Sequence, residues 1–121
     1  MTNLHIDRLG GLAVIECEGR IVRSDSAFEL RDAVQSQNDA RTILLDLTGV
    51  TALDGGGLGM MMFLQRWAYD HDIRLKLFNP TKAVWERLVV ANSIPALEVV
   101  SADEMRAMVA GAQPQPDRMA A

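Results

Sequence analysis

The sequence predicts a single α/β domain in which a mixed central β-sheet of four to five strands is covered by about four α-helices. Two segments of alternating apolar and polar residues flank Gly10-Gly11, which is typical of a hairpin. Residues 42–47 form a β-branched and apolar run without alternation, as in a strand that is buried on both faces. Later strand patterns are separated by segments with helical spacing, and this order favours a layered α/β domain.

Length and composition agree with one domain. The chain has 121 residues, of which 49% are hydrophobic and 23% are charged, enough to bury one core and keep a solvated surface. We expect the folded domain to span residues 1–110. Residues 111–121 hold two prolines and no periodic pattern, so we expect a flexible C-terminal tail there.

The first half of the chain gives a hairpin, a helix and a central strand. Apolar residues alternate on both sides of the glycine pair: Leu4 and Ile6 before it, and Leu12, Val14 and Ile15 after it. N-capping residues at 24–26 precede a helix whose apolar positions recur at helical spacing: Ala27, Leu30, Ala33 and Val34. Residues 42–47 are then expected at the centre of the sheet, with Asp46 near the end of that strand.

The second half alternates helices and strands. Residues 51–54 are expected as a loop that ends in an N-cap at Asp54, before a helix over residues 58–69. Alternation over 73–77 predicts a strand that Asn79-Pro80 ends, and a short helix from about Thr81 stops near Asn92, before a turn at residues 94–95. Residues 97–100 are expected as an edge strand, and a capping box at 101–104 starts a last helix.

Charge and residue usage restrict the class of function. The net charge of −4 argues against DNA or RNA as a partner, because phosphate backbones require clustered Lys and Arg. The single cysteine, Cys17, cannot form an internal disulfide, and no signal-peptide pattern is present at the start. The longest apolar run, residues 58–64, is far shorter than the roughly 20 residues of a membrane span. We therefore expect a cytoplasmic protein that does not insert into membranes.

Catalytic and metal-binding patterns are weak. His5 and His71 lie far apart, without a second ligand at metal-binding spacing, and Cys17 falls among apolar strand residues. Asp46 and Asp54 could pair as carboxylates, but a strand residue and a helix cap explain them better. We expect no enzyme activity, no cofactor and no metal.

The most informative segment runs from residue 44 to residue 59 as LLDLTGVTALDGGGLG. Three successive glycines after an acidic cap would let another chain approach the start of a helix without Cβ interference. The free N–H groups and helix dipole there could also hold an anion, such as a phosphate group of a partner. The alternative is an ordinary glycine-rich turn with a cap, which the surrounding strand-loop-helix order disfavours.

This segment resembles the strand-loop-helix signature of the STAS domain family, in particular of anti-sigma factor antagonists, which has an aspartate, two small residues and then Gly-Leu-Gly. Gly19-Arg20-Ile21 similarly resembles the family's earlier Gly-x-Leu stretch, and the order of elements agrees over residues 3–109. The resemblance implies a non-enzymatic module for regulation of transcription and signalling. Its partner would be an anti-sigma factor or a related serine-kinase-type ATPase, and we expect the contact surface at residues 51–62 and their neighbours: Thr51, Asp54, Gly55, Gly56, Gly57, Leu58, Met60, Phe63, Trp67, Arg23 and Ser24.

Two departures from the family pattern concern regulation. The serine that is phosphorylated in switched antagonists would precede Gly-Leu-Gly, where this chain has Gly56. The aspartate that often follows the Gly-x-Leu stretch is replaced by Val22. The usual phosphorylation switch is therefore absent, which implies a constitutive binder, and Thr51 remains as an alternative phosphorylation site.

The second helix carries more apolar surface than one buried face requires. Leu58, Met61, Met62 and Tyr69 are predicted to point inward, whereas Met60, Phe63 and Trp67 recur on another face. That stripe is either covered by neighbouring helices or forms an interface with a partner or in a homodimer. The interface reading predicts that Phe63→Glu or Trp67→Glu abolishes partner binding or self-association while the monomer stays folded.

Two other functions remain open. STAS-like domains also serve as small cytoplasmic subunits on the ATPase of a lipid ABC transporter, and the apolar second helix fits such a role. A small-molecule sensor with a pocket beside the glycine-rich loop is the other alternative, although no residue specifies its ligand.

Overall fold

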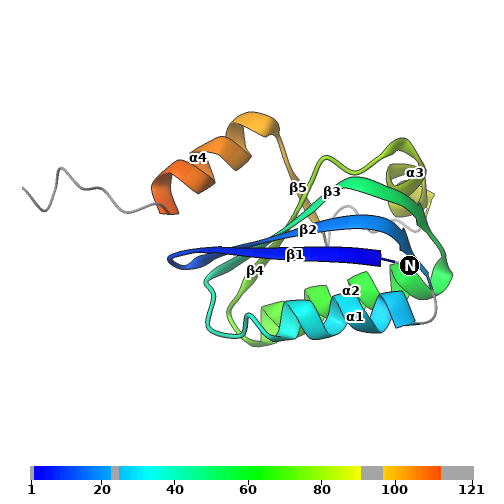
Figure 1. The fold of residues 1–121 in the computed structure, drawn as a ribbon, viewed down its shortest axis with the longest axis horizontal. Helices are drawn as coiled ribbons and strands as arrows, with labels where there is room; N and C mark the ends of the chain where they lie inside the picture. The colour runs from blue at the N-terminus through cyan, green and yellow to red at the C-terminus, as the bar shows by residue number, and fades with distance from the viewer. Residues whose placement is uncertain (1, 23–24, 91–96, 113–121) are drawn as a thin grey trace, which may run out of the picture.

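Five strands form one mixed sheet in the order β1-β2-β3-β4-β5 in a computed structural model, which describes residues 2–22, 25–90 and 97–112 (Figure 1). The elements follow the chain as β1 (Thr2–Leu9), β2 (Leu12–Ile21), α1 (Asp25–Gln35), β3 (Thr42–Leu53), α2 (Gly55–Asp70), β4 (Arg74–Phe78), α3 (Lys82–Val90), β5 (Glu98–Val100) and α4 (Ala102–Ala112). The first pair of strands is antiparallel and the other pairs are parallel. The predicted fold class, with an opening hairpin, a central third strand and a short edge strand, is confirmed.

The hairpin turn is two residues long. Leu9 pairs with Leu12, and between them Gly10 has a φ of 58°, a left-handed conformation that glycine adopts without strain. A positive φ at the first central residue fits a type II′ turn, whose twist matches that of the flanking strands.

The main core lies between the sheet and the helices α1 and α2, which run side by side under it (Figure 1). Fully buried side chains come from β2, β3, α1 and α2, among them Ile15, Leu30, Leu45 and Leu64. β3 pairs with both β2 and β4, and its centre is buried on both faces, with Leu45 in the main core and Leu44 in a smaller cluster on the opposite face, as its lack of alternation predicted.

Helix α4 covers part of the opposite face of the sheet (Figure 1). Met105, Met108 and Val109 are half-buried against a small cluster of Leu12, Leu44 and Val100. The predicted capping box is present, because Ser101 Oγ accepts the Glu104 N–H at 3.1 Å while Glu104 Oε1 accepts the Ser101 N–H at 3.0 Å. The hydrogen bond from the Ser101 N–H to the Glu104 carboxylate, with a smaller effect of the Ser101 side chain, holds the pKa of Glu104 below its usual value. The helix continues to Ala112, two residues beyond the expected domain end.

Four local predictions are wrong. Residues 51–53 belong to β3, which has 12 residues, so the expected loop is only the cap residue Asp54, and Asp46 lies inside the strand instead of near its end. The glycines at 55–57 already belong to α2. Tyr69 is 72% exposed instead of inward, because Leu64 and Ala68 occupy the buried face of the helix near its end.

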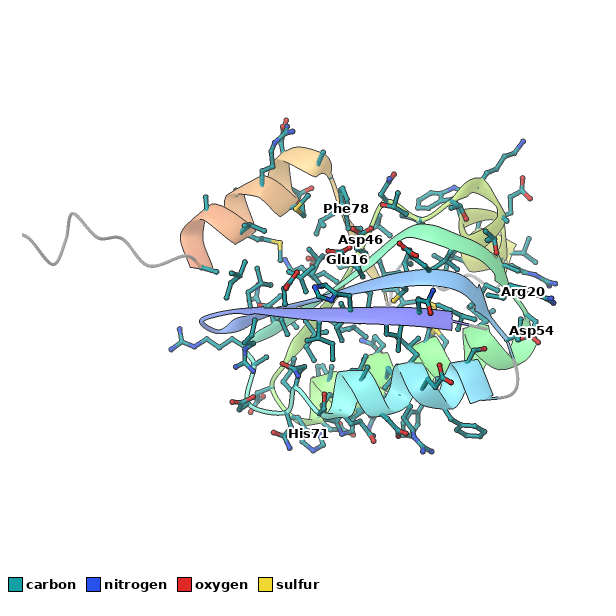
Figure 2. All side chains as sticks on the ribbon, in the orientation of Figure 1. Glu16, Arg20, Asp46, Asp54, His71 and Phe78 are labelled. Carbon is teal, nitrogen blue, oxygen red and sulfur yellow. The ribbon has the colours of Figure 1, made fainter. Side chains whose placement is uncertain are left out.

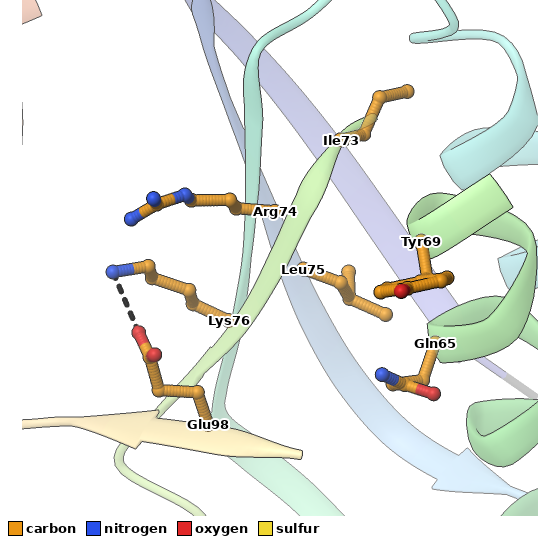
Figure 3. A pocket seen from close by; sticks show the side chains of 7 residues that line it. All are labelled: Gln65, Tyr69, Ile73, Arg74, Leu75, Lys76 and Glu98. Atoms are coloured by element: carbon orange, nitrogen blue, oxygen red, sulfur yellow. Dashed lines mark ion pairs between the residues drawn. The ribbon is translucent and has the colours of Figure 1, made fainter. Parts of the chain in front are cut away.

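Tyr69 instead lines a surface pocket beside the start of β4 (Figure 3). Gln65 and Leu75 lie next to it, and on the other side of the strand Lys76 pairs with Glu98 at 2.6 Å. The ion pair joins β4 to the short β5 across the sheet edge. The predicted stop at Asn92 and the turn at residues 94–95 lie outside the described residues.

Cys17 behaves as the small buried hydrophobic residue that its strand context predicted. Its side chain lies in the main core, and burial, with a smaller effect of the Asp46 charge, raises the pKa of the thiol from the ordinary 9.0 to about 12. A thiol this buried is not a nucleophile at neutral pH.

The raised thiol pKa predicts a loss of stability in alkali. The unfolded chain releases the thiol proton above pH 9 and the folded chain holds it to about pH 12, so stability is complete below pH 9 and declines as pH rises towards 12. The decline attributable to Cys17 should be on the order of 1 kcal/mol at pH 10. Urea unfolding at pH 8 and pH 10 measures it, with Cys17→Ala as the matched control. An equal decline in both proteins would contradict the assignment.

Candidate functional site

The first turns of α2 are positioned by the end of β3. Asp54 follows the strand directly, and its Oδ1 accepts the Gly57 N–H at 2.7 Å, while its backbone carbonyl accepts the Leu58 N–H at 2.8 Å. The predicted N-cap is therefore confirmed. Figure 2 shows Asp54 and Arg20 at the same end of the sheet, where β2 and β3 end and α2 begins.

The three glycines at this helix start have different environments. Gly57 is buried, and a Cβ added there would lie 2.1 Å from the Ile21 carbonyl oxygen and 2.8 Å from Leu53 Cδ1. Gly56 is half-buried, and Gly55 is exposed, with nothing within 4 Å of an added Cβ. The expectation that all three glycines lie bare therefore needs correction: Gly57 serves close packing of α2 on the end of β2.

An open face of α2 extends from Gly55 along the helix. Gly59 also has nothing within 4 Å of an added Cβ, and one turn further Phe63 is 50% exposed. Residues 55, 59 and 63 lie four apart, so they share one face. The result is a bare strip of helix backbone that ends at a half-exposed aromatic ring. We name this surface, made by Gly55, Gly59 and Phe63, the α2 open face.

The predicted stripe of Met60, Phe63 and Trp67 does not form one exposed surface. Met60 and Trp67 are half-buried and pack against the main core, as does Leu58, whereas Phe63 projects into solvent. The Trp67 ring also stacks on His71 with centroids 4.6 Å apart. Neighbouring elements therefore cover two members of the stripe and leave the third, Phe63, exposed, so an interface at Phe63 stays a prediction.

Thr51 lies in β3 just before the site. The β2–β3 pairing passes from Val50 to Ala52, so Thr51 falls at a register shift, and it is exposed. Its hydroxyl donates to the Gly19 carbonyl at 3.2 Å. A register shift commonly re-aims a side chain at the edge of a site, and here it coincides with the exposed Thr51, three residues before the cap Asp54.

Other predicted residues lie elsewhere or outside the description. Arg23 and Ser24 fall outside the described residues. Val22 is half-buried, and its N–H donates to Ser26 Oγ at 3.0 Å, which ties the end of β2 to the start of α1. Gly59 lies within the predicted contact segment 51–62 but was not named individually, although its four-residue spacing from Gly55 and Phe63 is visible in the sequence.

Two aspartates of this region, Asp54 and Asp46, are engaged in hydrogen bonds within the chain. The Asp54 carboxylate already accepts one N–H of the helix start, and Asp46 accepts the Thr48 hydroxyl at 2.6 Å and its N–H at 3.0 Å. In the part of the chain that the structure describes, no three metal-ligating side chains come together, and no helix is long and apolar enough to cross a membrane.

The cap at Asp54 is expected to contribute to stability. Asp54→Ala removes the acceptor for the Gly57 N–H and should lower the free energy of unfolding by about 1 kcal/mol, whereas Asp54→Asn should retain most of it. Urea unfolding of the three proteins measures the difference. Equal stability of the alanine and asparagine variants would contradict a capping role.

Comparisons with known proteins agree with this arrangement of sheet and helices. A family model described as Mlab, STAS domain, matches residues 4–93. The chain therefore belongs to the STAS domain family. A search of curated proteins found no match.

Solved structures of anti-sigma factor antagonists have the same fold. SpoIIAA in its unphosphorylated form superposes with a TM-score of 0.73 at 17% identity, over 90% of this chain and 97% of its own. An anti-sigma factor antagonist from Mycobacterium paratuberculosis superposes with a TM-score of 0.74 at 15% identity, over 90% of this chain and 94% of its own. The resemblance predicted from the sequence is confirmed at the level of family and fold.

Proposed function

We propose that this STAS domain is a non-enzymatic, cytoplasmic interaction module that binds an ATPase-fold protein, an anti-sigma factor or related serine kinase, through the α2 open face. The observation that carries the proposal is the combination of two glycines with open space above them and a half-exposed phenylalanine on one helix face. Glycine inside a helix costs stability, by roughly 0.5–1 kcal/mol relative to alanine. Gly59 has no packing contact that requires it, so close approach by another molecule is the best reason for its presence.

The proposal makes the domain a constitutive binder. The helix start has Gly56 where switched antagonists would have a serine, and a glycine cannot receive the added charge of about −1.5 to −2 that phosphorylation supplies. Thr51 is exposed three residues before the cap Asp54 and is the alternative position for such a modification. In the constitutive form the domain would hold an anti-sigma factor and release its sigma factor.

A second candidate is an accessory subunit on the ATPase of a lipid transporter. The apolar α2, with its half-exposed Phe63, fits this function as well. The same α2 open face would serve in both, so the identity of the ATPase distinguishes them.

Affinity capture from the native host, followed by mass spectrometry, tests the proposal. Wild-type protein is expected to retain an ATPase-fold partner, and Phe63→Glu is expected to lose it while thermal unfolding still reports a folded domain. A histidine-kinase-like ATPase supports the first function, and a transporter ATPase supports the second. Equal capture by both proteins would show that the α2 open face is not the interface.

A further inference from the structure

The outer side of β1 is a long open strand edge. The strand has eight residues and lies at one end of the sheet order, so within residues 2–22, 25–90 and 97–112 no strand pairs with its outer side (Figure 1). The opposite edge strand, β5, has only three residues. An exposed edge of this length is a template for pairing with another chain.

The hairpin register determines which backbone groups face outward. Leu9 and Leu12 flank a two-residue turn and so form a hydrogen-bonded pair, and such pairs alternate along an antiparallel ladder. The N–H and C=O groups of Asp7 and His5 therefore point towards β2. Those of Leu4, Ile6 and Arg8 point to the open side, where a second strand could accept and donate hydrogen bonds.

The side chains along this edge are apolar on one face and polar on the other. Ile6 pairs with the fully buried Ile15 on the helix-covered face, yet it remains 36% exposed. His5 and Asp7 lie on the opposite face, where His5 Nε2 and Asp7 Oδ1 are 3.2 Å apart. The edge thus offers an apolar contact at its centre on one face. On the other face it offers a histidine and a carboxylate, which can pair with each other.

We propose that two copies of this chain pair antiparallel through β1, with the two-fold axis at Ile6, to form one continuous ten-stranded sheet. Ile6 then faces Ile6 of the second copy in a hydrogen-bonded pair, and the outward groups of Leu4 face those of Arg8. On the other face His5 lies opposite Asp7 of the second copy, and this pairing occurs twice because the interface is isologous. Apolar cross-strand pairs, and pairs in which a histidine hydrogen-bonds a carboxylate, each stabilise such a ladder.

Neighbouring registers lack this complementarity. Because facing side chains must share a face, the two-fold axis can move only to His5 or to Asp7 if Ile6 is to stay near the centre. An axis at His5 places the two histidines opposite each other, and an axis at Asp7 places the two carboxylates opposite each other, which is destabilising. The register centred on Ile6 is the one that the side chains favour.

Variants with a single added cysteine in β1 test this register directly. In the proposed dimer the two copies of residue 6 have Cα atoms about 5.5 Å apart, within reach of a disulfide, whereas the two copies of residue 5 or residue 7 are offset along the strands by about 7 Å more. Ile6→Cys should therefore form a covalent dimer under mild oxidation, while His5→Cys and Asp7→Cys should not. The native Cys17 is buried and does not interfere.

The wild-type protein should have about twice the mass of its 13.3 kDa chain in light scattering at high concentration. His5→Asp should weaken the dimer about tenfold in Kd by placing carboxylates opposite each other, and His5→Asp with Asp7→His should restore it. Any of three results would overturn the proposal: a monomeric wild type, equal crosslinking of the cysteine variants at all three positions, or crosslinking at residue 5 or 7 instead of residue 6. Phe63 lies on α2, so Phe63→Glu should leave the β1 dimer intact. Failure of the dimer proposal is therefore distinguishable from failure of the proposed function.

Discussion

Gly57→Ala is expected to destabilise the domain by about 3 kcal/mol, the largest stability effect that the structure predicts for a single methyl group. The added Cβ would lie 2.1 Å from the Ile21 carbonyl oxygen and 2.9 Å from its carbonyl carbon, so the obstacle is backbone at the end of β2 and not a flexible side chain. Either α2 or β2 must shift, and both carry core residues on either side of the contact.

Gly59→Ala is the matched control, because it makes the same chemical change two residues further along the same helix. Nothing lies within 4 Å of its added Cβ, so the variant should gain about 0.5–1 kcal/mol from the higher helix propensity of alanine. Urea or thermal unfolding of both variants measures the contrast. If Gly57→Ala were as stable as the wild type, α2 would not pack on β2 as closely as described.

Gly59→Trp is expected to reduce binding of the captured partner by at least about 30-fold, the loss of a typical hot spot. The indole would fill the open space between Gly55 and Phe63 that the proposal assigns to the partner. Because that space belongs to solvent in the isolated chain, the fold should tolerate the substitution.

Gly59→Ala again serves as the control, since one methyl group takes up little of this space and should weaken binding far less than the indole does. Titration of the purified partner with the three proteins, monitored calorimetrically, gives the ratio of dissociation constants. Undiminished affinity of Gly59→Trp would place the contact on another surface.

Periodicity and turn chemistry predicted most of the fold, because these signals are local. Alternation around Gly10-Gly11 predicted the hairpin, and the β-branched and apolar run without alternation at residues 42–47 predicted a strand buried on both faces. The cap at Asp54 and the capping box at Ser101 were visible because their spacing reflects hydrogen bonds within one turn of helix.

The errors arose where distant segments decide the structure. Residues 51–53 contain turn-compatible residues, but β2 continues beside them to Ile21, and pairing with it extends β3. Likewise the sequence could not tell Gly57 from its neighbours, because its role depends on the Ile21 carbonyl, which is distant along the chain. The buried face of α2 was misjudged at Tyr69 since an apolar helix offers several alternative inward faces.

The candidate site was predicted in position but not in detail. The segment from Thr51 to the second helix was identified from its glycines and cap, and the structure reduces it to the α2 open face. Gly59 could be assigned to the α2 open face only when the space around each glycine was known. Exposure of Phe63 beside the half-buried Met60 and Trp67 also required the packing of neighbouring elements.

Amide hydrogen exchange of the full chain, alone and with its captured ATPase partner, tests the central claim most directly. The docking proposal predicts that the partner slows exchange in the first turns of α2 and in the end of β3 beside them, with little change in α4 on the opposite face of the sheet. Unchanged exchange across α2 together with protection confined to α4 or β1 would contradict it.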